Sequence, residues 1–333
     1  MTKWAHVERD VREAEHKKTV AQYKREIAHY RDALDESEEA LNAALALSSS
    51  DPDPKPLTVE VEDKSEAVAV ALASDWHVEE RIDKRSVNNM NEFNLKIAEQ
   101  RIRNFFKGVV RWTEIQRTGV KVEDLVLWLG GDFISGHIHP ELAESNSMTP
   151  VEAIVWVQDL IAEGIETLTH HFRRILIPTS YGNHGRDTIK TRHSTGYKHS
   201  YEWLMYKNLQ RLTGDTQVLW QVGESYHNIM KLYDYTLRFH HGDSLKYQGG
   251  IGGLTIPVEK AIASWNKSPV KADIDCFGHW HTQIQSPKFC SNGSLCGYGA
   301  YALSIKAPYE PPQQTFFLID KKRGRTVTCP IIL

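Results

Sequence analysis

The sequence has few cysteines and no strong excess of charge of either sign, and each shortage excludes a class of protein. Four cysteines, without C-x-x-C spacing, are too few for a disulfide framework in a chain of 333 residues. We therefore expect reduced thiols and a cytoplasmic protein. A formal net charge of −3 excludes coating of nucleic acid through bulk charge, although a local basic patch remains compatible with it.

Long hydrophobic runs are also missing. No apolar run approaches the roughly 20 residues that span a bilayer. The first residues, MTKWAHVERD, are too charged for the apolar core of a secretory signal. We expect no membrane association.

Glycine and proline are absent from residues 1–47, which are rich in the helix formers Ala, Glu, Lys, Arg and Leu. From residue 20, seven of eight heptad a and d positions are apolar or aromatic. The pattern predicts a helical hairpin or a short coiled coil through which copies of the chain associate, or an amphipathic helix lying on its own domain. The sequence SSSDPDPKP at 48–56 then breaks any helix. The heptad positions are Val20, Tyr23, Ile27, Tyr30, Leu34, Ser37, Leu41 and Ala44.

We divide the chain into a helical or coiled-coil extension (1–47), a linker (48–57) and a catalytic domain (58–333). In that domain continuous apolar runs predict buried strands, and helical patterns follow them, which indicates an α/β fold. Expected strands are 67–74, 124–130, 174–180, 226–232, 236–241, 273–277, 283–289, 298–305, 315–320 and 325–331. Expected helices are about 90–117, 150–171, 199–213 and 256–266.

Side chains of metal-ligand type follow five of these strands at once. The motifs are Asp-Trp-His at 75–77, Gly-Asp at 131–132, Gly-Asn-His at 182–184, His-Gly at 241–242 and Gly-His-Trp-His at 278–281. Because the carboxyl ends of neighbouring strands meet at one crevice, we expect these side chains to converge there. A mixed set of carboxylates, one amide and several imidazoles suits Mn²⁺, Fe²⁺ or Zn²⁺ better than Mg²⁺ or Ca²⁺.

Taken in order, these five motifs resemble those of the calcineurin-like metallophosphoesterase superfamily, over about residues 67–282. The resemblance implies a four-layer α-β-β-α sandwich, here with the N-terminal helical extension. It also implies two divalent ions, most readily Mn²⁺, and a hydroxide bridging them that attacks the phosphorus atom in line. One ion would be held by Asp75, His77 and His281, the other by Asn183, His241 and His279, with Asp132 bridging the two.

The resemblance further implies that His184, the last residue of Gly-Asn-His, protonates the leaving oxygen as a general acid. One departure concerns the next position, where many family members carry an acid and this chain has Gly185. Either Asp187 reaches back to orient His184 or another group does so. Arg186 either contacts substrate phosphate or is a solvated loop arginine.

Residues outside the motifs must choose the substrate, since the superfamily includes phosphoprotein phosphatases, nucleotide phosphodiesterases and SbcD-like DNA exonucleases. Residues 186–211 carry six Lys or Arg against two acids, with aromatic residues between them. This pattern suits binding of a DNA strand, although Trp203 and Tyr206 are better read as the apolar face of a helix. Lys190, Arg192 and His193 are the better candidates for contact with phosphate. Four glycines within 249–253 indicate a mobile loop or a close backbone approach to phosphate.

A second Gly-His-x-His pattern occurs at 136–139. Its strand end already supplies Asp132, so we expect His137 and His139 on a loop at the rim of the site rather than as ligands. In the SbcD-like exonucleases a functional His follows the shared Asp by three residues, where this chain has Ser135. His137 is therefore a catalytic candidate and His139 a substrate contact; the alternative is a pair of ordinary surface histidines.

The sequence thus predicts a dinuclear-metal-dependent phosphoesterase that cleaves phosphodiester bonds, foremost a DNA nuclease. The stretch GGDFISGHIHPEL is also similar to uncharacterised calcineurin-like proteins of bacteriophages, in which case the protein would act in the host cytoplasm. The alternatives are a phosphatase or phosphodiesterase acting on small nucleotides or phosphoproteins, and a non-catalytic scaffold.

Overall fold

The computed structural model describes residues 3–49, 65–247 and 253–333. The chain divides into two units, residues 1–60 and 61–333. Most of the predicted linker, and the glycine-rich loop apart from Gly253, lie outside the described residues. The domain boundaries therefore stay a prediction.

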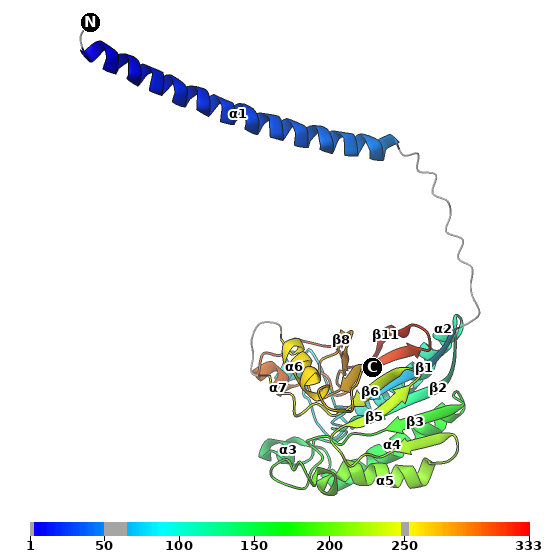
Figure 1. Ribbon diagram of the computed structural model, residues 1–333. Helices are drawn as coiled ribbons and strands as arrows, with labels where there is room; N and C mark the ends of the chain where they lie inside the picture. Colours follow the sequence, from blue (N-terminus) through cyan, green and yellow to red (C-terminus); the bar gives the residue numbers. More distant parts are fainter. Residues whose placement is uncertain (1–2, 50–64, 248–252) are drawn as a thin grey trace. The chain divides into compact units, whose positions relative to one another are not determined.

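The described part of the first unit, residues 3–49, is one helix, α1 (Lys3–Ser49), coloured blue in Figure 1. It is continuous, so the hairpin interpretation is wrong, and it ends two residues beyond the expected 47. Every side chain described between residues 10 and 42 is exposed. Within this unit the apolar heptad positions from Val20 to Leu41 therefore form an exposed stripe.

The second unit contains a six-stranded sheet with the order β11-β10-β1-β2-β3-β4 (Figure 1). The strands β1 to β4 run parallel, β10 pairs antiparallel with the other edge of β1, and β11 pairs antiparallel with β10. Their bounds are β1 Ser65–Ala73, β2 Val120–Leu129, β3 Arg174–Pro178, β4 Val218–Gln221, β10 Gln313–Asp320 and β11 Gly324–Ile332.

Helices α2 (Leu95–Arg117), α4 (Pro150–Thr169) and α5 (Tyr201–Thr213) contribute to the core on one face of this sheet. Strand β1 shows how the sequence separates the two faces, since successive side chains point to opposite sides. Its alanines 67, 69, 71 and 73 belong to the core with the helices, where small side chains let the helices approach closely. Val68, Val70 and Leu72 belong to a second core, shared with the other sheet.

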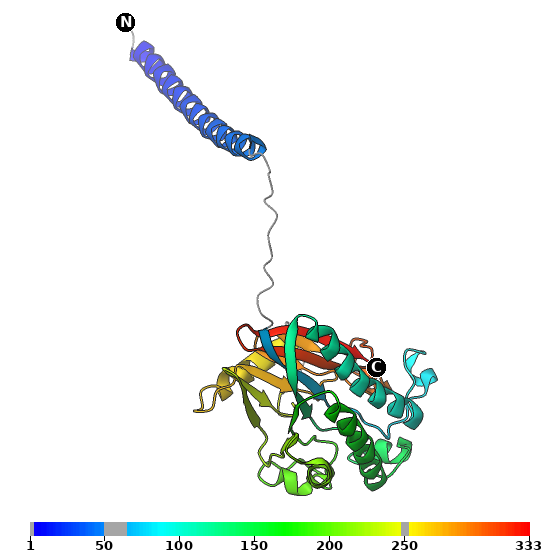
Figure 2. The same ribbon diagram turned by 90° about the vertical axis from the view of Figure 1, so that its right-hand side faces the viewer.

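That other sheet has five strands in the order β5-β6-β7-β9-β8 and is also mixed (Figure 2). Side chains of α6 (Thr255–Trp265) form a third core with Phe277 and Phe289. The expected α/β class, with two mixed sheets and helices, is confirmed. The strand bounds are β5 Asn228–Leu232, β6 Tyr235–Phe239, β7 Ile274–Phe277, β8 Ile284–Ser286 and β9 Phe289–Ser291.

Two expected strands are wrong. Residues 298–305, expected as a strand, contain the short helix α7 (Ala300–Ser304), which begins after the extended Gly299. The expected strand at 283–289 is interrupted by a turn, so β8 and β9 pair as a hairpin. The sequence did not indicate β4, α3 (Pro140–Ser145) or the 3₁₀ turns η1 (Lys84–Val87) and η2 (Gly196–His199). No helix in the described part of the chain is both long enough and apolar enough to cross a membrane.

Candidate metal centre

The segments that follow β1, β2, β6 and β7 are joined by backbone hydrogen bonds at the carboxyl ends of these four strands. The Asp75 N–H donates to the carbonyl oxygen of Gly131 at 3.0 Å, and the Gly278 N–H donates to that of His241 at 2.8 Å. The two sheets are linked as well, since the His279 N–H donates to Asp75 Oδ1 at 2.8 Å. This network brings residues from across the chain to one place.

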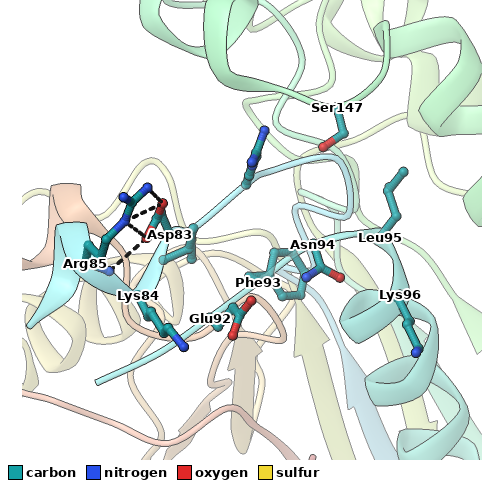
Figure 3. Close-up of a pocket in the computed structure, with 11 residues that line it drawn as sticks. Asp83, Lys84, Arg85, Glu92, Phe93, Asn94, Leu95, Lys96 and Ser147 are labelled. Atoms are coloured by element: carbon teal, nitrogen blue, oxygen red, sulfur yellow. Dashed lines mark hydrogen bonds and ion pairs between the residues drawn. The ribbon is translucent and has the colours of Figure 1, made fainter. Parts of the chain in front are cut away.

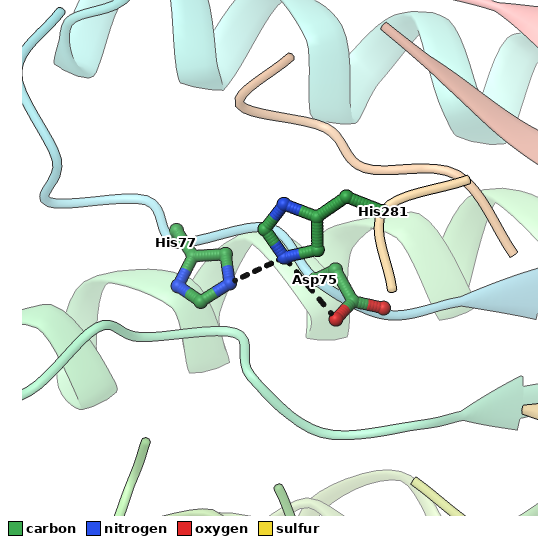
Figure 4. Close-up of side chains that lie close together, drawn as sticks. All are labelled: Asp75, His77 and His281. Atoms are coloured by element: carbon green, nitrogen blue, oxygen red, sulfur yellow. Dashed lines mark hydrogen bonds and ion pairs between the residues drawn. The ribbon is translucent and has the colours of Figure 1, made fainter. Parts of the chain in front are cut away.

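The first group of candidate ligands is Asp75, His77 and His281, shown in Figure 4. One donor atom from each lies within 4.8 Å of the others. The Nε2 atoms of the two histidines are 3.1 Å apart, and His281 Nε2 is 3.5 Å from Asp75 Oδ1. All three side chains direct a donor atom toward the same point.

The second group is Asp132, His241 and His279, again within 4.8 Å of one another. His241 Nε2 lies 2.9 Å from Asp132 Oδ2 and 3.1 Å from Asn183 Oδ1, so the amide joins this group. Seven side chains expected as ligands therefore lie in two groups, while coordination of a metal by them stays a prediction.

Their chemistry fits a cation. His241 Nδ1–H donates to the Gly130 carbonyl oxygen at 2.9 Å, which leaves the lone pair of Nε2 facing two further acceptors. Acceptors facing one another repel unless a cation or a proton lies between them. Burial by itself would lower the pKa of His241, but the Asp132 carboxylate outweighs it and raises that pKa well above its usual value. A bound divalent ion would take the place of that proton.

The other rings are ready to donate lone pairs. Burial lowers the pKa of His281 to about 3 and that of His279 to about 4, so both imidazoles are neutral near neutral pH. Burial also raises the pKa of Asp75 to about 7. A nearby divalent cation reverses that effect, because it favours the ionised carboxylate.

Backbone conformation singles out the same residues. Among the described residues, nine that are not glycine have positive φ, a conformation that L-amino acids rarely adopt. Five of the nine are candidate ligands. Strain of this kind persists where the surrounding structure imposes it, often at functional sites. The five are Asp75 (φ 57°), His77 (48°), Asp132 (52°), His279 (69°) and His281 (51°).

Several supporting residues carried no signal in the sequence. Asp75 Oδ2 accepts a hydrogen bond from the buried Ser74 hydroxyl at 2.5 Å, which in turn accepts one from Asn292 at 2.9 Å. His77 Nδ1 lies 2.8 Å from the hydroxyl of Ser135, and that hydroxyl donates to Glu80 at 2.6 Å. Ser135 thus orients the candidate ligand His77.

His184 is oriented by the backbone. Its Nδ1–H donates to the Ser135 carbonyl oxygen at 3.0 Å, and its own N–H donates to Asp132 Oδ1 at 2.8 Å. The ring centroid lies 4.9 Å from that of His77. Asp187 instead lies 2.9 Å from His199 Nδ1, so the alternative in which Asp187 orients His184 is wrong.

The guanidinium of Arg186 is held within its own loop. It donates to the backbone carbonyls of Asn183, Thr188 and Ile189. These bonds shape the segment that carries Asn183 and His184, and contact of Arg186 with phosphate stays a prediction. Farther along the same loop, three expected substrate contacts are exposed: Lys190, Arg192 and His193.

The first Gly-His-x-His pair lies apart from the ligand groups. His137 and His139 are both exposed, and His139 precedes the first turn of α3. Their neighbour Gly136 packs against the Gly-Asn-His loop, since a Cβ atom there would lie 2.7 Å from the His184 carbonyl oxygen. His137 therefore follows a residue that contacts the Gly-Asn-His loop, and its catalytic role stays a prediction.

A cavity of about 560 Å³ lies farther along the segment that follows β1 (Figure 3). Four basic and two acidic side chains line it, and Arg85 is paired with Asp83. None of the candidate ligands lines this cavity. The charged residues are Arg81, Asp83, Lys84, Arg85, Glu92 and Lys96.

Comparison with known proteins identifies no family. No protein-family profile matches the sequence, and no curated protein matches it. Among solved structures, Vps29 from Cryptosporidium parvum is 12% identical, with a TM-score of 0.32 and coverage of 80% of this chain and 97% of that one.

Two further structures are similarly distant. Vps29 from Entamoeba histolytica in complex with Zn²⁺ is 12% identical, with a TM-score of 0.29 and coverage of 79% of this chain and 97% of that one. An uncharacterised predicted phosphoesterase from Streptococcus pneumoniae is also 12% identical, with a TM-score of 0.30 and coverage of 81% and 98%. Likenesses at this level do not assign the chain to a family.

Proposed function

We propose that this chain is a dinuclear-metal-dependent phosphoesterase of the calcineurin-like type, with a four-layer α-β-β-α sandwich as its catalytic domain. The observation that carries the proposal is the pair of adjacent nitrogen and oxygen groups at the strand ends. One comprises Asp75, His77 and His281, and the other Asp132, His241 and His279 with Asn183 beside them. Asp132 is proposed as the bridge between two ions.

Mn²⁺ is the proposed metal, with Fe²⁺ and Zn²⁺ as alternatives that the same ligands suit. Two such ions would ionise a water molecule near neutral pH and neutralise charge on the phosphate oxygens. The chain contributes the proton for the leaving oxygen. His184 serves this purpose because its Nδ1–H is held by the Ser135 carbonyl, which leaves Nε2 to carry that proton. His137 is proposed to contact the phosphate or leaving group from the neighbouring loop.

The proposed substrate is DNA. Supporting this are the exposed cations Lys190 and Arg192, on the loop that begins at Asn183 and His184. The aromatic residues nearby give no such support. Tyr206 is fully buried, and the partly buried Trp203 packs against Tyr197, with ring centroids 5.3 Å apart, so both rings are used in packing. The case for a nucleic-acid strand as substrate therefore depends on charge. We also propose that the protein acts in a cytoplasm, which would be that of the host if a phage encodes it.

A substrate panel tests the proposal. Purified protein with Mn²⁺ is offered a generic phosphodiester, a phosphomonoester, and labelled single- and double-stranded DNA. We expect cleavage of the diester and of DNA. Cleavage of the monoester alone would contradict the nuclease proposal in favour of a phosphatase, and no turnover of any substrate would favour the scaffold alternative.

We also propose that α1 joins two copies of the chain as a parallel coiled coil. Its apolar a and d side chains from Val20 to Leu41 are 38–70% exposed. Contact of this apolar surface with water is unfavourable, and pairing of two helices would bury it. One ion pair supports a parallel arrangement. In a parallel pair, Glu26 at a g position of one copy faces Arg31 at an e position of the other, and symmetry provides this ion pair twice.

A further inference from the structure

A buried carboxylate on α5 links two of the loops that carry candidate ligands. Glu202 has no exposed surface. Its Oε1 accepts a hydrogen bond from the Phe133 N–H at 2.7 Å, and its Oε2 accepts one from the Gly182 N–H, also at 2.7 Å. Phe133 directly follows Asp132, and Gly182 directly precedes Asn183. Each oxygen of one carboxylate therefore holds a different ligand-bearing loop.

The absence of a side chain at Gly185 leaves room for the side chain of Glu202. A Cβ atom at residue 185 would lie 2.9 Å from Cγ of Glu202 and 3.0 Å from its Cδ, closer than such atoms ordinarily approach. Any larger residue at this position, directly after His184, must push the Glu202 side chain aside. The glycine and the glutamate therefore form a fitted pair, although 17 positions separate them in the sequence.

The arrangement is costly in free energy. Burial raises the pKa of Glu202 to about 7, and the nearby Asp132 adds to the effect. Burying an acid lowers the stability of the folded protein unless hydrogen bonds compensate. A buried acid is therefore expected where its hydrogen bonds are needed. Both of its acceptor atoms are used on backbone N–H groups next to candidate ligands, which indicates what the side chain is needed for.

We propose that Glu202 is a positioning residue, which fixes the β2 and β3 loops relative to each other so that Asp132 and Asn183 meet the same metal ion. The proposal deepens the proposed function, because it depends on metal binding at this site. It does not depend on which phosphoester is cleaved.

Glu79 provides a matched comparison. It is also fully buried and holds the same loop, but one oxygen, Oε1, accepts both the Ser135 N–H at 2.9 Å and the Gly136 N–H at 2.8 Å. Its other oxygen has no hydrogen-bond partner. A glutamine at 79 can keep both bonds through its carbonyl oxygen. A glutamine at 202 must turn its NH₂ group toward one of the two N–H donors and lose that bond.

The test compares Glu202→Gln with Glu79→Gln, and uses Glu163→Gln on the exposed surface of α4 as a control. Mn²⁺ affinity is measured by calorimetric titration, and protection of the Phe133 and Gly182 amides by hydrogen exchange of the metal-free protein. We expect Glu202→Gln to weaken Mn²⁺ binding about 10- to 100-fold and to expose one of the two amides. Glu79→Gln should cause a clearly smaller loss, and Glu163→Gln none.

Gly185→Ala tests the same contact while leaving the carboxylate in place, and it serves if Glu202→Gln does not fold. It should weaken Mn²⁺ binding. Its effect should be much smaller in the Glu202→Gln background than alone, because both changes disturb the same Glu202 contact. Wild-type Mn²⁺ affinity in Glu202→Gln, or weakened binding with both amides still protected, would overturn the proposal. Metal binding is read without turnover, so a wild-type protein that binds Mn²⁺ but cleaves no ester refutes the proposed function alone.

Discussion

His184 contacts both groups of candidate ligands. Its ring packs against His77, and its backbone N–H donates to Asp132, yet neither ring nitrogen is in a ligand group. The Ser135 carbonyl fixes the ring from the side of Nδ1. These contacts suit a group that moves a proton beside the proposed metal ions without coordinating them.

His184→Ala should therefore lower turnover by about 10²- to 10⁴-fold and leave bound metal unchanged, because a general acid contributes about that factor. Turnover of the generic phosphodiester and metal per chain by elemental analysis are measured on the same sample. The exposed His170 on the far end of α4 provides the control, and His170→Ala should change neither quantity. Loss of metal together with activity would refute the general-acid role.

His227 predicts an acid sensitivity that is independent of the metals. Burial lowers its pKa to about 4, and His240 and Arg238 add to this effect. The unfolded chain, with a pKa near 6.5 at this residue, binds more protons than the folded protein between these values. The free energy of unfolding should therefore fall as the pH falls from about 6.5 to 4.

Because the ring is partly exposed, we expect His227 to contribute only about 1–2 kcal/mol to this loss, less than its full shift implies. His227→Phe should make the stability profile correspondingly flatter. Urea unfolding of the metal-free protein between pH 4 and 7 measures this, with His170→Phe as the control. Equal slopes for wild type and His227→Phe would show that the ring does not titrate as described.

At the scale of elements, α1 stands out for the exposed apolar stripe along one face of the helix. Its stripe follows the heptad from Val20 onward, and Glu26 and Arg31 would form ion pairs in the proposed parallel dimer. The sequence pattern identified the helix and the stripe. The pattern does not identify the partner of this face, so its pairing with a second copy of α1 is an inference.

Ile27→Asp should convert a dimer into a monomer, because it places a charge at an a position. Ala28→Asp, which adds the same charge at the adjacent b position, should leave the dimer intact. Light scattering after size exclusion measures the mass of each. Glu26→Arg should weaken the dimer and Arg31→Glu should restore it, whereas a monomeric wild-type chain would refute the coiled coil.

At the scale of the whole molecule, metal binding should couple to folding, because the ligands come from both sheets. A ligand at 100 times its Kd stabilises the folded state by about 2.7 kcal/mol. For a domain of this size that corresponds to a rise in Tm of roughly 5–10 °C.

Thermal unfolding with chelator and then with excess Mn²⁺ measures this difference. Asp132→Asn should remove most of it, because the substitution takes a negative charge from the proposed bridge. Glu163→Gln should retain the full shift. An equal Tm for the wild-type protein with and without Mn²⁺ would contradict a metal site shared between the two sheets.

The sequence by itself determined the order of strands and helices through most of the second unit, and the motifs that follow five strands. Both are local: apolar runs and periodicity mark elements, and the candidate ligands lie within a few residues of a strand end. Where the local pattern was ambiguous, as at 298–305, the expectation failed.

Only the tertiary structure decided which side chains hold those motifs in place. Glu202, Glu79 and Asn292 contact the loops that carry the candidate ligands from elsewhere in the chain, and no spacing in the sequence indicates these contacts. The structure also separated the two Gly-His-x-His pairs, leaving His137 and His139 exposed while His279 and His281 join the two groups. The reason is physical: a buried polar contact exists only once distant strands have paired, so it leaves no periodicity in the sequence.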